Sequence, residues 1–173
     1  ILNKNVGYLL SNPVEYQVTD GLNIDPVLDS YHKQTITDLD SEIAKGCSVF
    51  GMNYEYIYAN EDAEPESAIL DVRNTIIAYD NTLQHKKMFA VNYRPQYLKP
   101  TDTQPDYFDV LVVDKSMISY YILKQDNLKL INQEAHVFQE VPVIEYINNR
   151  DYLGDFEPVI SLIDAYNIIQ SDR

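Results

Sequence analysis

One cysteine and three histidines are the residues of this sequence that could support covalent catalysis. Cys47 lies in the segment KGCSVFG, and the histidines are at positions 32, 85 and 136. A reactive thiolate needs a helix N-terminus or a cationic neighbour, because either of them lowers the pKa of the thiol. Cys47 instead lies near the end of an apolar helical pattern, inside an acidic region. We therefore interpret it as a small buried hydrophobic residue; a hydrolase built on Cys47 and a histidine stays an alternative.

Carboxylates at alternating positions are the second group that could do chemistry. Asp38, Asp40 and Glu42 have the spacing of the first ligands in a calcium-binding loop. That loop also needs glycine at its sixth position and glutamate at its twelfth, where this chain has Ile43 and Val49. The histidines lack a zinc-site spacing, and no glycine-rich phosphate loop is present. We expect no catalytic residue, no metal and no cofactor.

The charge of the chain disfavours direct binding to DNA or RNA. Its 173 residues include 27 acidic and 13 basic ones, which gives a net charge of -14. A phosphate backbone is held by several Lys and Arg, whereas no basic cluster here exceeds Lys86-Lys87. No apolar run approaches the ~18 residues of a membrane span. We expect neither sequence-specific nucleic-acid binding nor a membrane partner, and we interpret the acidic residues as a solvated surface.

Helical patterns dominate the first 50 residues. A short helix opens the chain, and residues 12–18 (NPVEYQV) alternate as a strand does. From residue 25 to 50, apolar residues recur at three- and four-residue steps, which is helical spacing. Asp25 is a suitable N-cap before a proline, and Thr35 or Thr37 is a suitable cap for a second segment.

A tyrosine-rich strand is predicted to follow the helices directly. Gly51 ends the helical pattern, and residues 52–60 (MNYEYIYAN) switch to a period of two. This period places Tyr54, Tyr56 and Tyr58 on one face. Such a ladder could stack sugars or bases, but packing inside a half-buried sheet is the stronger interpretation.

Short β-rich runs fill the rest of the chain until a closing helix. They cover residues 68–72, 75–80, 86–98, 107–113, 116–123, 128–131 and 141–148. The connections DK and KQDN have the length and residue types of hairpins, so an antiparallel meander is predicted. Asp155 is the expected N-cap of the last helix, whose apolar stripe is Phe156, Val159, Ile160, Ile163 and Tyr166. The fold class is α+β, in one domain.

Several of these segments resemble the portal proteins of tailed bacteriophages, in the branch typical of phages and prophages of Gram-positive bacteria. The strongest resemblance is carried by the run VPVIEYINNRDYLGDFEPVISLIDAYNIIQSD. The segments GYLLSNPVEYQV, AKGCSVFGMNYEYIYAN and ILDVRNTIIAYDNTLQHKKMFAVNYR agree with the family in the same order. The resemblance thins between residues 97 and 140.

The resemblance implies a structural protein rather than an enzyme. Residues 1–173 would form the portal wing domain, with its last helix leading toward a stem; stem, clip and crown would lie outside this chain. The full-length protein would form a dodecameric ring at one capsid vertex, through which DNA enters and leaves. Its partners would be capsid, scaffold and neck proteins, and terminase through regions absent here. Its location would be the virion, and the host cytoplasm during assembly.

Four residues around the closing helix are the candidates for wing-to-stem or subunit packing. They are Phe156, Ile163, Asp164 and Tyr166. Ordinary capping and core packing is an equally good interpretation of these residues. A rival function for the whole chain is an acidic protein-binding module of the DNA-mimic type, without catalysis.

Overall fold

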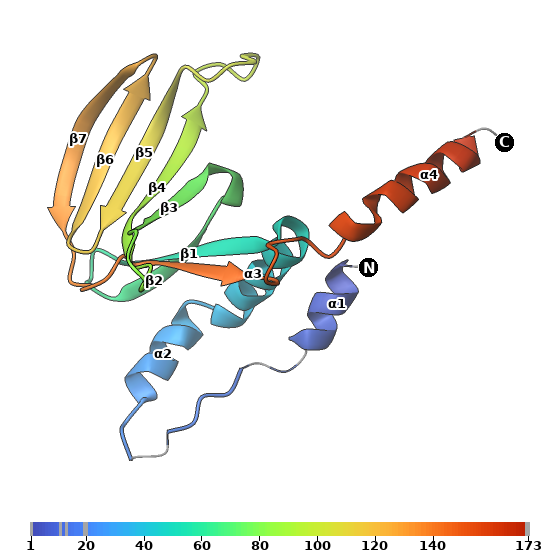
Figure 1. Cartoon of the computed structure of the whole chain (residues 1–173). Coiled ribbons are helices and arrows are strands. Elements are labelled where there is room, and N and C mark those ends of the chain that lie inside the picture. The colour runs from blue at the N-terminus through green and yellow to red at the C-terminus, as the bar shows by residue number, and fades with distance from the viewer. Residues whose placement is uncertain (1, 11, 13, 19–20, 172–173) are drawn as a thin grey trace. The chain divides into compact units, whose positions relative to one another are not determined.

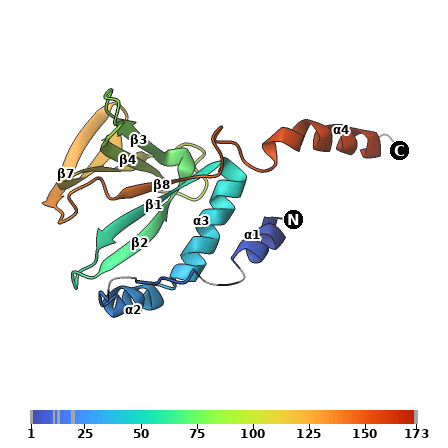
Figure 2. The ribbon, with the colours of Figure 1, turned by 60° about the horizontal axis from the view of Figure 1, so that its bottom comes forward.

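The computed structural model describes residues 2–10, 12, 14–18 and 21–171. The chain forms two compact units. The helical unit comprises residues 1–53 and 145–173, and the sheet unit comprises residues 54–144. Each unit is described by itself below, and the two views in Figures 1 and 2 label their elements. The mixture of helices with antiparallel sheets confirms the predicted α+β class.

The helical unit begins with three helices. They are α1 (Leu2–Leu9), α2 (Asp25–Lys33) and α3 (Ile36–Phe50). Helix α1 packs beside α3 (Figure 2), and Val6 of α1 and Ile43 of α3 are buried. The predicted pair of helices between residues 25 and 50 is thus confirmed. Asp25 is the first helical residue rather than the N-cap, and its N–H donates to Asn23 Oδ1.

The strand predicted at residues 12–18 is wrong for residues 14–18, which form no strand; residue 13 lies outside the described residues. The ring of Tyr16 packs instead against the ring of Tyr31 in α2, with centroids 5.2 Å apart. An alternating pattern does not provide a partner strand, and a segment without a partner cannot form the backbone hydrogen bonds of a sheet.

Within the described ranges, eight strands form two sheets. The first sheet has the order β2-β1-β8 and is made of β1 (Met52–Ala59), β2 (Pro65–Leu70) and β8 (Val143–Ile147). The second has five strands in sequence order: β3 (Thr75–Tyr79), β4 (Lys87–Gln96), β5 (Tyr107–Asp114), β6 (Met117–Lys124) and β7 (Asn127–Ala135). All four neighbouring pairs in this sheet are antiparallel, so the predicted meander is confirmed (Figure 1).

The core of the sheet unit lies among residues of both sheets. Val113 of β5 is 1% exposed, and Ala90 of β4 and Ile118 of β6 are also buried. Tyr54 and Tyr56 of β1 are buried, and the rings of Tyr56 and Tyr58 stack with centroids 5.5 Å apart. The tyrosine ladder therefore packs within its own unit, as the packing interpretation requires.

Candidate packing helix and the turn that holds it

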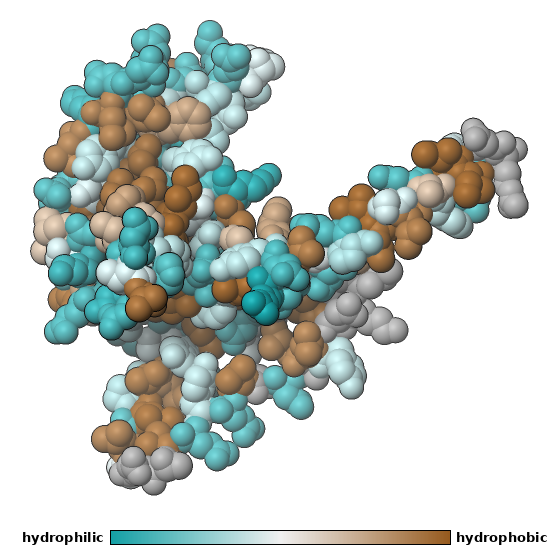
Figure 3. Space-filling view, in the orientation of Figure 1, coloured by the Kyte–Doolittle hydropathy of each residue, from teal (hydrophilic) through white to brown (hydrophobic). Residues whose placement is uncertain are grey.

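The closing helix of the helical unit exposes many apolar side chains. Helix α4 (Ile160–Ser171) follows a short 3-10 helix, η2 (Glu157–Val159). None of its residues is buried. Figure 3 shows brown, apolar side chains along α4 on the face in view. Because each such side chain gains roughly 1.5–3 kcal/mol when it is fully buried, α4 is suited to pack against a further surface.

The four candidate residues differ in where the structure places them. Ile163 and Tyr166 lie three residues apart on α4 and are 45% and 62% exposed. Asp164 is also exposed on α4. Phe156 precedes η2 and is half-buried, so it lies outside the exposed surface of α4. The helix thus brings together three of the four candidates.

The predicted single stripe misses half of the apolar surface of α4. Leu162, Ile168 and Ile169 are each more than half exposed, and they lie outside the stripe of Ile163 and Tyr166. The sequence ISLIDAYNIIQS could have shown this, because at 3.6 residues per turn its apolar residues are not confined to one stripe of the helix.

Asp155 is not the N-cap of the closing helix, which corrects the sequence prediction. Phe156 occupies the cap position of η2, and no side chain there bonds a backbone N–H of the first turn. The Asp155 carboxylate instead accepts hydrogen bonds from Ser48 Oγ and from Asn148 Nδ2, the latter at 2.9 Å. These two donors, led by Ser48, hold the pKa of Asp155 below its ordinary value. The Asp155 side chain thus binds α3 and the turn after β8 rather than the first turn of the closing helix.

The backbone around Asp155 is joined to the end of α3. The Asp155 N–H donates to Ser48 O at 2.8 Å, and the Asn148 N–H donates to Gly51 O at 2.9 Å. Gly154 is buried, and a Cβ there would lie 2.5 Å from Val49 O. The chain that leads into α4 is thus held against the last turn of α3 by backbone bonds that leave no room for a side chain at Gly154.

Replacing Asp155 by asparagine is expected to lower the free energy of unfolding by about 0.5–1 kcal/mol near neutral pH, because a charged acceptor of two hydrogen bonds is lost at an exposed site. Since the folded-state pKa of Asp155 is lowered, its contribution is present above the unfolded-state value of about 3.9 and is lost as the pH falls through the folded-state pKa. The difference in free energy of unfolding between the two proteins should therefore disappear at acidic pH. Urea unfolding of both proteins across this range measures it.

Asp151→Asn is the matched control, since it makes the same change in the same turn and no hydrogen bond to the Asp151 carboxylate is described. An Asp151→Asn effect as large as that of Asp155→Asn would contradict the assigned role.

The surroundings of Cys47 and of the carboxylates do not favour catalysis or metal binding. Burial raises the pKa of the Cys47 thiol, and Cys47 Sγ lies 3.6 Å from the carbonyl oxygen of Tyr146. A raised pKa opposes formation of the nucleophilic thiolate. Among the described residues no group of three or more His, Cys, Asp or Glu side chains is placed to hold a metal ion. Within the same ranges no helix is long and apolar enough to cross a membrane.

Comparison with known families places the whole chain in one of them. Residues 1–173 match the family model described as phage portal protein, SPP1 Gp6-like. Comparison with curated proteins finds no match.

Proposed function

Because the chain belongs to the SPP1 Gp6-like family of phage portal proteins, we propose that it forms the wing domain of a subunit in the portal ring at one capsid vertex. The ring is the conduit through which DNA enters the head during packaging and leaves it at ejection. It also takes part in head assembly and joins the head to the neck. Its role is structural, without catalysis.

The observation that carries this proposal is the family match over all 173 residues. Two properties of the chain support it. The net charge of -14 suits a conduit that must not hold its DNA tightly. The exposed apolar side chains of α4 suit a helix that packs against a stem or a neighbouring subunit.

We assign this packing to Ile163 and Tyr166, with Asp164 beside them on α4 and Phe156 at the entry to the helix. The partners of the assembled ring are capsid, scaffold, neck and terminase proteins. The protein is located in the virion, and in the host cytoplasm while heads assemble.

A phage that carries this gene in an inactivated form tests the proposal. We expect its heads to contain no DNase-protected genome, and we expect the intact gene supplied in trans to restore packaging. Full packaging without the gene product would contradict the proposed function. Supplying a Cys47→Ala copy separates the alternative hydrolase from the structural role, since a structural protein restores packaging without the thiol.

A further inference from the structure

The loop between β3 and β4 holds a leucine out in solvent. Leu83 is fully exposed. Asp80 Oδ1 accepts hydrogen bonds from the Thr82 hydroxyl at 2.7 Å and from the Lys86 N–H at 3.0 Å. The Asp80 N–H donates to Lys86 O at 2.9 Å and closes the loop. A loop that is already ordered loses little conformational entropy on binding, so Leu83 is well placed to anchor a contact.

A pocket of about 370 Å³ lies elsewhere in the sheet unit, and the family match assigns it no role. Asp71 in its wall is paired with Arg73 at 2.7 Å. The other two charged residues of the wall, Arg94 and Glu134, have opposite signs, so the charges of the wall balance. The aliphatic part of the wall consists of Ile69, Leu70, Leu111 and Ile118. Such a wall without net charge favours an apolar side chain over an ion.

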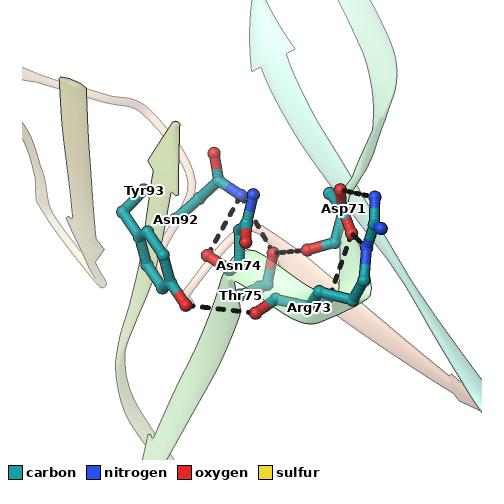
Figure 4. A network of polar contacts seen from close by, with 6 residues as sticks. All are labelled: Asp71, Arg73, Asn74, Thr75, Asn92 and Tyr93. Atoms are coloured by element: carbon teal, nitrogen blue, oxygen red, sulfur yellow. Dashed lines mark hydrogen bonds and ion pairs between the residues drawn. The ribbon is translucent and has the colours of Figure 1, made fainter. Parts of the chain in front are cut away.

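Hydrogen bonds fix one edge of this pocket, as Figure 4 shows. Asp71 and Asn92 are the lining residues at this edge. Thr75 Oγ1 donates to Asp71 O at 2.8 Å and accepts from Asn92 Nδ2 at 3.0 Å. The Tyr93 hydroxyl donates to Arg73 O at 3.2 Å. This edge is therefore formed before a partner arrives, which lowers the entropic cost of binding.

Leu83 does not fill the pocket of its own chain. It is not among the residues that line the pocket, and its side chain is fully exposed. On β4 the pocket begins at Asn92, whereas the loop ends at Lys86, roughly 20 Å away along an extended strand. The leucine and the pocket thus lie apart on one unit, and surfaces placed in this way join copies of a chain head to tail.

The charges beside the two features are complementary. Lys86 is exposed in the loop that carries Leu83. Ala59 lines the pocket at the end of β1, and the loop of residues 60–64 that follows it carries three exposed acidic residues. They are Glu61, Asp62 and Glu64. These opposite charges favour a second copy as the partner at this place, whereas the net charge of -14 makes two copies repel one another elsewhere.

We propose that Leu83 of one copy inserts into this pocket of a second copy, with Lys86 beside the acidic loop of residues 60–64. The contact removes the exposed leucine side chain from water. A pair joined in this way still presents one leucine and one pocket, so further copies can add by the same contact. The inference names a contact between subunits of the proposed ring, and it rests on the proposed function for closure of that ring.

Two variants of the intact chain test this contact, because each keeps only one half of it. Leu83→Asp keeps the pocket, and Ala68→Trp keeps the leucine while its larger ring fills the pocket from β2. Neither variant alone should associate, whereas a mixture should form one-to-one pairs. Nuclear magnetic resonance of methyl-labelled Leu83→Asp, titrated with unlabelled Ala68→Trp up to millimolar concentration, measures the pairing. We expect shifts of the methyl signals of Ile69, Leu111 and Ile118.

Further changes in the unlabelled Ala68→Trp partner control the experiment. Adding Leu83→Asp should weaken binding at least about tenfold. Adding Val137→Asp makes the same kind of change at another exposed apolar residue and should leave affinity unchanged within about twofold. Adding Lys86→Glu should weaken binding about threefold or more at low salt, and less at high salt. If Ala68→Trp lowers the thermal midpoint, Ala59→Trp at an exposed position of the same wall takes its place.

The outcomes separate this contact from the portal role. Absence of any shift at millimolar concentration would overturn the proposal. Equal losses of binding with Val137→Asp and Leu83→Asp would also overturn it, since the binding would then not depend on Leu83 in particular. A ring of the whole protein without pairing in the mixture would contradict this contact alone. Pairing in the mixture without a ring would support the contact and contradict the proposed function.

Discussion

Replacing Gly51 by alanine is expected to destabilise the protein by more than about 3 kcal/mol, which is more than the same change at Gly21 or Gly7 should cost. Gly51 has φ +79°, a conformation that costs an L-residue energy. A Cβ there would also lie well inside contact distance of the carbonyl group of Tyr152. The Cβ is fixed by the backbone of residue 51 and the atoms that it meets are backbone, so no side chain can rotate to relieve the clash. For a chain of this size the midpoint of thermal unfolding should fall by roughly 6–12 °C.

Two other glycines separate the causes of this effect. Gly21 also has positive φ, at +69°, but nothing lies within 4 Å of a Cβ there, so Gly21→Ala should cost only about 1 kcal/mol. Gly7 lies in α1 with the same open space and no positive φ, so Gly7→Ala should be neutral or slightly stabilising. Calorimetry of the three variants measures the series. Equal losses at Gly51 and Gly21 would show that the contact with Tyr152 contributes nothing.

Replacing Ile163 and Tyr166 together by aspartate is expected to prevent assembly of the ring while leaving the subunit folded. Both side chains are exposed in the helical unit, so folding should change by no more than about 0.5 kcal/mol per site. In a ring every subunit repeats the same contact, and a loss of about 1.4 kcal/mol per contact raises the dissociation constant tenfold. Sedimentation velocity and the thermal midpoint measure the two outcomes on the same sample.

Ser161→Asp is the control for this change, because position 161 lies on the opposite side of α4 by the helical period. It should leave the ring intact. A ring that survives the double substitution would remove α4 from the subunit contact, and a lower thermal midpoint would show that these side chains stabilise the subunit itself.

The meander was predictable because each of its strands carries its own signal. Runs such as YFDVLVV and SMISYYIL combine β-branched and aromatic residues with two-residue connections, and consecutive strands joined this way pair with one another. The helices on either side of Thr35 were predictable for the same reason, since helical periodicity is a local property of the sequence. The prediction of a strand at residues 12–18 failed because an alternating pattern does not show whether a partner strand is present.

The turn before α4 could not be predicted from the sequence, for a different reason. Asp155 has the residue type and position of an N-cap. Only the fold reveals that Ser48, more than 100 residues earlier, donates a hydrogen bond to its carboxylate. The requirement for glycine at position 51 was partly visible as a helix stop, whereas the approach of Tyr152 was not. The pocket in the sheet unit is equally non-local, since residues that line it, such as Tyr56, Arg94 and Glu134, come from strands far apart in the chain.

The most direct test of the portal assignment is native mass spectrometry of the protein expressed from the whole reading frame that contains this chain, with negative-stain imaging of the same sample. We expect a closed ring of about a dozen copies with a central channel, because head-to-tail contacts that close under rotation produce such rings. A discrete monomer or dimer at every salt concentration would contradict it.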